Sequence, residues 1–293
     1  MKRGKVKIKK HQKLSDYTTI GIGGPAPEVY LPETEVELID LLKRLKAEKR
    51  SYRIIGNGSN VLADDRGVDE IVVCTRSLER TFSVDGNIVS VDAGYPMAQL
   101  AYQTASRGLS GLEFAVGIPG SIGGVVRMNA GAHQHTISEV VDSVRLIQAD
   151  GHSVTASKDE LRFTYRFSAI PEDAIIVRVN LKLIPDDSKR IHEQIREYND
   201  HRTSSQPLRE KSAGCIFKNP AGCSAGKLIE DSGLKGHAVG GAVVSEIHAN
   251  FIVNRNQATF QDVIQLIGHI KREVSEKQGV LLQEEVVVWR REA

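Results

Sequence analysis

The 293 residues suffice to bury a large core, and chains of this length usually form two or three domains. Hydrophobic residues make up 40% of the chain and charged residues 26%, a composition that excludes a disordered protein. The formal net charge is only +2, so no overall basic field argues for a protein that binds nucleic acid.

The chain starts with a basic segment, because six of its first ten residues are Lys or Arg. We interpret this segment as a solvated tail. No apolar run reaches the about 20 residues that span a bilayer, and no apolar stretch follows the basic start as it does in a secretory signal. These features predict a cytoplasmic protein with no membrane or nucleic-acid partner.

The three cysteines, Cys74, Cys215 and Cys223, include no CxxC pair. Such a set predicts neither a disulfide framework nor a zinc site, and it fits a reducing compartment. Cys74 ends an apolar run, so we expect its side chain in the core. We expect no bound metal, because four histidines lack the spacing of a metal site: His133, His135, His237 and His248.

The N-terminal third predicts a helix, two strands and a second helix. Thr34 opens a capping-box pattern that starts a helix reaching about residue 49. A short strand over 53–55 runs into a glycine-rich turn, and alternation over 88–93 indicates another strand. Pro96 suits the first position of the next helix and Gly108 its C-terminal cap. The apolar face expected for the first helix consists of Val36, Ile39, Leu42 and Leu45.

The rest of the chain predicts hairpins as well as helices. Two strand-like runs between 140 and 156 flank Asp150-Gly151, a signal for a two-residue hairpin loop. A strand rich in β-branched residues covers 174–183. Helices are expected after the boundary at 185–188, near Ser224, and after the cap Thr259, and a strand covers 286–288. The buried side expected for the last helix consists of Val263, Ile264, Ile267, Ile270 and Val274.

This irregular alternation of helices, strands and hairpins favours an α+β fold over a doubly wound parallel sheet. Three glycine clusters punctuate it, at 21–24, 56–60 and 117–124. Glycine reaches positive φ at low cost and allows backbone N–H groups to approach phosphate oxygens closely. The two longer clusters therefore predict a diphosphate site. A Walker A pattern and a GxGxxG turn between a strand and a helix are both absent, so the sequence favours another dinucleotide fold.

Several segments then identify a family. They are YTTIGIGG at 17–24, GNGSNVL at 56–62, GIPGSIGG at 117–124, NAGA at 129–132, YRFS at 165–168, AGCIFKNP at 213–220, AGKLIEDSGLKG at 225–236 and EEV at 284–286. Because these segments occur in the order that the family has, the chain resembles the UDP-N-acetylenolpyruvoylglucosamine reductases. These are FAD enzymes that complete UDP-N-acetylmuramate for bacterial peptidoglycan.

The resemblance implies an FAD-binding fold of the p-cresol methylhydroxylase/vanillyl-alcohol oxidase type, in which two subdomains clamp FAD. We expect these subdomains at 1–75 and 76–190, a substrate-binding domain at 191–277, and a C-terminal strand with the catalytic glutamate at 278–293. The loop 56–60 holds no histidine, so FAD is expected to be bound noncovalently. No tyrosine-bearing insertion follows Ser168, which indicates the shorter type of the family, and we expect a monomer.

The resemblance also assigns binding residues by position. Lys218, Asn219 and Lys235 are expected to bind the uridine diphosphate of the substrate, and Arg202 to face the flavin. The whole set expected to bind FAD is Ile55, Gly56, Asn57, Gly58, Ser59, Asn60, Val61, Gly117, Ile118, Pro119, Gly120, Ser121, Gly123, Gly124, Asn129, Ala130, Gly131 and Arg202.

The implied reaction uses NADPH as reductant and delivers hydride to the methylene carbon of UDP-N-acetylglucosamine enolpyruvate. Negative charge then develops on the neighbouring carbon. Arg166 matches the arginine of the family that stabilises this charge, since a guanidinium grips a carboxylate with two N–H donors. Glu285 matches the glutamate beside the enolate and would act in its protonated form, with Glu284 as the adjacent alternative.

The proton donor departs from the usual pattern, because the family usually has serine where this chain has Cys215. A thiol has a pKa of about 8.5 and is a stronger acid than an alkanol. We therefore expect Cys215 to deliver the proton. Two other functions stay open from the sequence: an FAD-dependent carbohydrate or hydroxy-acid oxidase of the same fold, and a non-catalytic regulator that binds a sugar nucleotide or a flavin.

Overall fold

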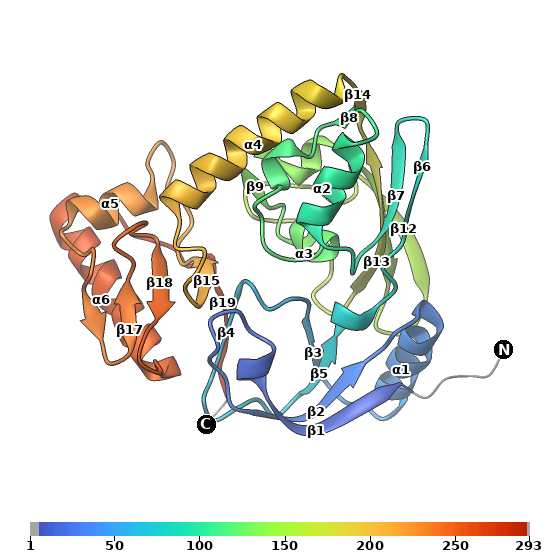
Figure 1. The fold of residues 1–293 in the computed structure, drawn as a ribbon. Helices are drawn as coiled ribbons and strands as arrows, with labels where there is room; N and C mark the ends of the chain where they lie inside the picture. The colour runs from blue at the N-terminus through green and yellow to red at the C-terminus, as the bar shows by residue number, and fades with distance from the viewer. Residues whose placement is uncertain (1–5, 292–293) are drawn as a thin grey trace. The chain divides into compact units, whose positions relative to one another are not determined.

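The structure is a computed structural model that describes residues 6–291. The chain folds into two compact units, which contain segments from different parts of the sequence (Figure 1). Unit 1 consists of 6–9, Glu28–Asn57 and Glu70–Arg202, and unit 2 of Lys10–Pro27, Gly58–Asp69 and 203–291. The division by role into 1–75, 76–190, 191–277 and 278–293 stays a prediction.

Unit 1 is built on a five-stranded antiparallel sheet of order β12-β11-β13-β7-β6. Helix α3 contacts its strands β13 and β7, and α2 lies beside α3 in Figure 1. The apolar residues between this sheet and the helices form the main core of the unit. The elements are β6 Phe82–Asp85, β7 Ile88–Asp92, α2 Met97–Ala105, α3 Ile122–Arg127, β11 Val141–Ile147, β12 Ser153–Ser157 and β13 Ile175–Lys182.

A second sheet has the order β1-β2-β5-β3, and its strand β5 pairs in parallel with β2 and β3. Residues 7–10, predicted to be part of a solvated tail, instead form the first half of β1 at the edge of this sheet. An edge strand can carry exposed lysines, which also discourage pairing with another chain. Residues 1–5 of the predicted tail lie outside the described residues. The strands are β1 Lys7–Lys13, β2 Pro25–Leu31, β3 Tyr52–Ile55 and β5 Ile71–Cys74, with Cys74 fully buried as predicted.

Helix α1, Glu35–Ala47, begins at the predicted N-cap, where the side chain of Thr34 accepts a hydrogen bond from the N–H of Glu37. Of its predicted buried face, Leu42 and Leu45 are confirmed and Ile39 packs against the core while partly buried, but Val36 is 56% exposed. The fully buried positions follow the spacing i, i+3, i+4 and i+7 from Leu38, and all four are leucines: Leu38, Leu41, Leu42 and Leu45.

Two other local predictions need correction. Pro96 is the N-cap of α2 rather than its first residue, and the helix ends at Ala105, before Gly108. The hairpin between β11 and β12 has a longer loop than the two residues predicted, because Ile147 pairs with Ser153. The N–H of Gln148 donates to the carbonyl of His152 and closes this loop, in which Gly151 has a φ of 81°.

Unit 2 contains an antiparallel sheet of order β15-β18-β17-β16 and a parallel pair formed by β19 and β4. Helix α6 starts at a capping box on Thr259 and buries six apolar residues as a stripe. Four of the five predicted residues belong to this stripe, and the fifth, Ile264, is only partly buried. The elements are β4 Val61–Ala63, β15 Ser212–Cys215, α5 Ala225–Asp231, β16 Ala238–Val239, β17 Ala242–Val244, β18 Phe251–Asn254, α6 Phe260–Gln278 and β19 Val287–Trp289.

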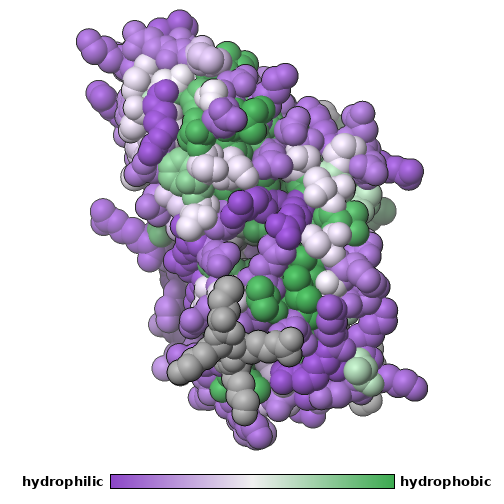
Figure 2. Space-filling view, turned by 90° about the vertical axis from the view of Figure 1, so that its right-hand side faces the viewer, coloured by the Kyte–Doolittle hydropathy of each residue, from purple (hydrophilic) through white to green (hydrophobic). Residues whose placement is uncertain are grey.

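Shorter elements complete the fold, together with the long helix α4, Ser188–Ser205. On the face shown in Figure 2, hydrophilic residues cover most of the surface and apolar residues gather in separate places. No helix within residues 6–291 is long and apolar enough to cross a membrane. The remaining elements are β8 Leu109–Ser110, β9 Gly131–Ala132, β10 His135–Thr136, β14 Ile184–Pro185 and the 3-10 helices Leu14–Asp16, Thr75–Ser77, Glu113–Ala115 and Ile137–Glu139.

Candidate active site

In unit 2, two chain segments far apart in the sequence run side by side and carry Cys215 and Glu285. The carbonyl of Ile216 accepts a hydrogen bond from the N–H of Glu285 at 2.8 Å. One residue further along, Phe217 forms an antiparallel bridge with Glu284. Two of the three residues predicted to be catalytic, Cys215 and Glu285, therefore lie on adjacent backbone segments.

A buried amide fixes one of these segments. Asn250 is only 3% exposed, and its side-chain amide pairs with both backbone polar groups of Phe217, as a neighbouring strand would. Its Oδ1 accepts from the N–H of Phe217 at 2.9 Å, and its Nδ2 donates to the carbonyl of Phe217 at 2.8 Å. Both backbone polar groups of the buried residue Phe217 are thus satisfied, which holds the strand end after Cys215 in one position.

The adjacent glutamates have different surroundings. The carboxylate of Glu284 accepts a hydrogen bond from the Nζ of Lys271 at 2.9 Å on the exposed side of the segment. Partial burial acts to raise the pKa of Glu284, but the hydrogen bond from Lys271 outweighs it, so that the pKa lies below its usual value. Glu285, by comparison, is half-buried. The choice of Glu285 over Glu284 as the residue that faces the substrate stays a prediction.

The backbone of Glu285 is also held from its carbonyl end. The Nδ2 of Asn60 donates to this carbonyl at 3.1 Å, and the carbonyl of Asn60 accepts from the N–H of Val287 at 3.0 Å. Asn60, predicted to contact FAD, thus has a structural contact with the strand that carries Glu285. Val61, next in the chain, pairs with Val287 in the parallel pair of β4 and β19.

The three residues predicted to bind the substrate differ in their contacts. Lys218 is half-buried and forms no ion pair with any residue between 6 and 291. The Oδ1 of Asn219 accepts from the N–H of Ala225 at 3.0 Å and so shapes the loop before α5. Lys235 pairs with Glu230 at 2.7 Å. Of the two lysines, Lys218 is therefore the one whose ammonium group is not already paired with a carboxylate of the described residues.

Arg166, the third residue predicted to be catalytic, lies at the tip of a tight turn in unit 1. Thr164 and Phe167 exchange two backbone hydrogen bonds of 3.1 Å, which leaves Tyr165 and Arg166 as the two turn residues. The φ of Arg166 is 55°, a left-handed conformation that is uncommon for any residue other than glycine. Its Nη2 donates to the carbonyl of Gly131 at 3.1 Å, and its guanidinium lies over the ring of Tyr165.

The glycine loop 117–124 leads into α3 in the same unit. A Cβ on Gly117 would lie 2.1 Å from the Cδ of Arg202, so the absence of a side chain lets this arginine lie across the loop. A Cβ on Gly124 would meet no protein atom within 4 Å. The protein itself therefore does not require glycine at 124, and the close approach of a ligand would explain it.

The same loop has unused donors. Neither the N–H of Gly120 nor that of Ser121 donates a backbone hydrogen bond within the described part of the chain. The hydroxyl of Ser121 makes no capping hydrogen bond to α3. By contrast, the N–H of Gly123 is taken up by the carbonyl of Ala93 at 3.0 Å. This donor set fits the phosphate oxygens of a dinucleotide.

The other predicted loop starts at the end of β3, which Ile55 occupies. Gly56 and Asn57 belong to unit 1, where Arg76 donates to the carbonyl of Asn57 at 3.3 Å. Gly58 belongs to unit 2 and has a φ of 67°, and a Cβ there would lie 1.9 Å from the carbonyl oxygen of Tyr17. Close packing of two backbones therefore requires glycine at 58.

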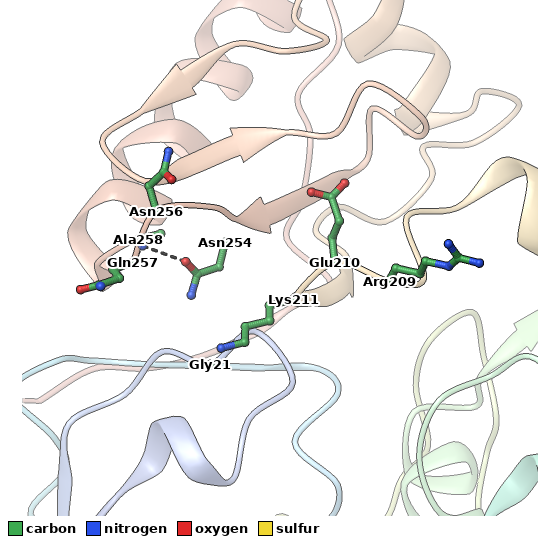
Figure 3. Close-up of a pocket in the computed structure, with 8 residues that line it drawn as sticks. All are labelled: Gly21, Arg209, Glu210, Lys211, Asn254, Asn256, Gln257 and Ala258. Carbon is green, nitrogen blue, oxygen red and sulfur yellow. Dashed lines mark hydrogen bonds between the residues drawn. The ribbon is translucent and has the colours of Figure 1, made fainter.

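An open pocket in unit 2 contains none of the predicted site residues (Figure 3). The side chain of Lys211 extends toward Gly21, and Arg209 points away from it. Asn254 ties the walls together, since it donates to the carbonyl of Ile20 and accepts from the N–H of Ala258. The lining residues are Gly21, Arg209, Glu210, Lys211, Asn254, Asn256, Gln257 and Ala258.

Sequence reasoning overlooked Asn250, which positions the segment after Cys215. The only signal in the sequence is that an amide directly precedes the apolar run Phe251–Val253. Only the structure reveals its partner, since Phe217 is 33 residues away. No group of three or more His, Cys, Asp or Glu side chains comes together as metal ligands within residues 6–291.

Comparisons with known proteins give consistent matches along the chain. Residues 206–289 match the family described as UDP-N-acetylenolpyruvoylglucosamine reductase, C-terminal domain, and residues 26–157 match an FAD binding domain. A UDP-N-acetylenolpyruvoylglucosamine reductase of Caldicellulosiruptor saccharolyticus is 40% identical over 284 residues, which cover 96% of this chain and 91% of that protein.

Solved structures agree. The crystal structure of UDP-N-acetylenolpyruvylglucosamine reductase from Thermus caldophilus has a TM-score of 0.83 and 40% identity, and it covers 98% of this chain and 99% of that one. Cholesterol oxidase from B. sterolicum shares only the fold, with a TM-score of 0.50 and 14% identity over 61% of this chain and 38% of that one. These matches confirm the α+β fold with an FAD-binding domain of the p-cresol methylhydroxylase/vanillyl-alcohol oxidase type.

Proposed function

The chain belongs to the UDP-N-acetylenolpyruvoylglucosamine reductase family, and we propose that it reduces UDP-N-acetylglucosamine enolpyruvate to UDP-N-acetylmuramate with NADPH as the reductant. It is an FAD-containing oxidoreductase. The observation that carries the proposal is the 40% identity to a reductase of this name over 96% of the chain. The reaction belongs to the synthesis of peptidoglycan precursors.

The cofactor is held by the glycine loops in this proposal. The N–H groups of Gly120 and Ser121 bind phosphate oxygens, and Gly124 lets the backbone come close to them. Arg202, which lies across Gly117, places a cation near the flavin. The loop 56–60 holds no histidine, so FAD is bound noncovalently. When bound, FAD supplies the hydride that reduces the double bond of the substrate.

Arg166 binds the substrate carboxylate and stabilises the charge that spreads into it after hydride arrives at the methylene carbon. A guanidinium keeps its charge at any working pH and offers paired donors in a fixed plane. Preorganised donors of this kind lower the barrier by about 3–4 kcal/mol in comparable oxyanion sites. The turn that holds Arg166 provides the preorganisation, because two backbone hydrogen bonds close it.

Glu285 and Cys215 complete the proposed chemistry. An ionised carboxylate would repel the developing enolate, so Glu285 acts as the neutral acid and donates a hydrogen bond. The Sγ–H of Cys215 gives its proton to the α-carbon, which forms the new C–H bond and leaves a thiolate that solvent reprotonates. The placement of both residues on paired backbone segments supports this assignment.

Lys218 and Asn219, with Lys235, bind the uridine diphosphate in this proposal. Since Lys235 is paired with Glu230, binding of a diphosphate there requires exchange of that exposed partner. We also propose that the enzyme acts as a monomer in the cytoplasm, where three free cysteines suit the reducing conditions.

A steady-state assay tests the proposal. The FAD-loaded protein should oxidise NADPH only when the enolpyruvyl sugar is present, and the product should be heavier than the substrate by two hydrogen atoms in mass spectrometry. An oxidase of the same fold would instead consume oxygen with a carbohydrate or hydroxy acid and ignore NADPH. A binding protein without catalysis would show neither reaction, and either result would overturn the proposal.

A further inference from the structure

The turn that carries Arg166 is anchored from outside by a second, buried side chain. Asn129 is 4% exposed and lies just after α3, the helix that follows the glycine loop. Its Nδ2 donates to the carbonyl of Thr164 at 2.8 Å, and its Oδ1 accepts from the N–H of Ser138 at 3.2 Å. One amide thus joins the turn of Arg166 to the 3-10 helix Ile137–Glu139.

The backbone of Asn129 points to the same conclusion. Its φ is 41°, in the left-handed region that asparagine tolerates better than most residues. Two left-handed non-glycine residues, Asn129 and Arg166, therefore lie on segments joined by a side-chain hydrogen bond. Strained positions persist only where surrounding contacts hold them, and they cluster at functional sites.

Two further contacts tie the same segments together. The hydroxyl of Ser168, which is 7% exposed, donates to the carbonyl of Arg127 at 2.7 Å. The guanidinium of Arg127 in turn donates to the carbonyls of Pro171 and Ala174. The turn is thus fastened on both sides of Arg166, at Thr164 and at Ser168, to the end of the helix that the glycine loop starts.

We infer that Asn129 is a positioning residue for Arg166, and not a contact to the cofactor as its place in the NAGA segment predicts. Its amide oxygen and one of its amide hydrogens are committed to Ser138 and Thr164. This inference rests on the proposed function, in which Arg166 stabilises the enolate. It adds a direct mechanical link between the end of α3 and the turn that presents the guanidinium.

The link has a measurable consequence. Displacement of a catalytic group by about 1 Å can lower a rate by about 10²-fold, even when the mutated residue touches no reactant. Loss of the Thr164 contact should therefore slow the step that needs Arg166, reoxidation of the reduced flavin by the enolpyruvyl sugar. Arg166 has no role in the reduction of the flavin by NADPH in the proposed mechanism, so this step should keep its rate.

The sharpest variant is Asn129→Asp. Aspartate keeps the size, the oxygen that faces Ser138 and the tolerance of a left-handed φ, but it loses the donor to Thr164. The matched control is Asn87→Asp, which removes a similar amide contact to the carbonyl of Leu183 at 3.1 Å elsewhere in unit 1. Both variants are loaded with FAD, and both half-reactions are followed by anaerobic stopped-flow absorbance, with the Kd for FAD measured by flavin fluorescence.

We expect Asn129→Asp to slow flavin reoxidation by about 10²-fold, with flavin reduction and the Kd for FAD within about 3-fold of the wild type and of Asn87→Asp. In an Arg166→Ala background, the additional effect of Asn129→Asp should disappear, because coupled residues are not additive. Asn129→Gly removes both contacts without backbone strain and should reproduce the loss if the aspartate variant folds poorly.

Other outcomes overturn the inference. A Kd for FAD raised 10-fold or more, with normal reoxidation of the bound flavin, would make Asn129 a cofactor contact. Additive losses in the Arg166→Ala background would reduce it to a general structural residue. A wild-type protein whose reduced flavin ignores the enolpyruvyl sugar refutes the proposed function itself. By contrast, an active wild type with an unaffected Asn129→Asp variant refutes only the positioning role.

Discussion

The carboxylate of Glu284 lies 2.9 Å from the ammonium group of Lys271, an ion pair on the exposed side of the segment that also carries Glu285. Because Glu284 is already paired with Lys271, we expect Glu285 and not Glu284 to act in catalysis. Glu284→Gln should change the rate of flavin reoxidation by less than about 3-fold, because exposed ion pairs contribute little. Glu285→Gln should slow it by about 10²–10³-fold, as the loss of a donor at an oxyanion site does. Stopped-flow absorbance of both variants checks this, and equal effects would contradict the assignment.

The three cysteines should differ in reactivity and consequence. Cys74 is buried, and burial raises the pKa of its thiol, so it should resist alkylation. In a Cys223→Ser variant, which removes the exposed thiol, alkylation of Cys215 should abolish turnover. Cys215→Ser should stay active and resist the reagent. Peptide mass spectrometry with parallel assays measures both, and full turnover after confirmed alkylation of Cys215 refutes its role as proton donor.

Asn250 should stabilise the protein through its two hydrogen bonds to Phe217. Asn250→Ala leaves a buried N–H and a buried carbonyl without partners, which should lower the free energy of unfolding by about 1–3 kcal/mol for each group. Asn87→Ala loses only one partly buried contact and serves as the control. Urea unfolding at a fixed FAD concentration compares them. Equal losses of unfolding free energy in the two variants would contradict a particular stabilising role for the two hydrogen bonds between Asn250 and Phe217.

Asp92 should make stability depend on acid pH. Burial favours its neutral form, but hydrogen bonds from Thr81 and Arg178 outweigh burial and lower the pKa of the carboxyl. The stability gained is therefore complete above the unfolded pKa of about 3.9 and is lost as pH falls through the lower folded value. Asp92→Asn should cost about 1.5–3 kcal/mol at pH 7. The difference in the free energy of unfolding between wild type and Asp92→Asn should narrow below about pH 4 in urea titrations. A difference that stays constant with pH would contradict a contribution from the ionised Asp92 carboxylate.

Local patterns predicted many elements well. The cap at Thr34 and the apolar stripe of α6 follow from spacing and from short-range hydrogen bonds, which are properties of contiguous sequence. The basic start of the chain was misread for the opposite reason. Its lysines indicate solvent exposure correctly, but the pairing of β1 at a sheet edge depends on partners distant in the sequence.

The candidate site shows the same limit. Family segments point to Arg166, Cys215 and Glu285, and the structure places Glu285 beside the segment of Cys215. The residues that hold these groups could not be predicted, because Asn129 contacts Thr164 from 35 residues away and Asn60 contacts Glu285 from 225 residues away. Both were expected to bind FAD from their motifs. Motifs mark where polar residues gather, whereas only coordinates reveal which atom each of them contacts.

An anaerobic titration followed by visible absorbance tests the central claim most directly. NADPH is added to the FAD-loaded protein until the flavin bands bleach, and UDP-N-acetylglucosamine enolpyruvate is then added in equal amount. The account predicts that the oxidised spectrum returns in full upon the second addition, since the sugar accepts the stored hydride. A flavin that bleaches with NADPH but stays reduced in the presence of the enolpyruvyl sugar would contradict the proposed function and leave the fold intact.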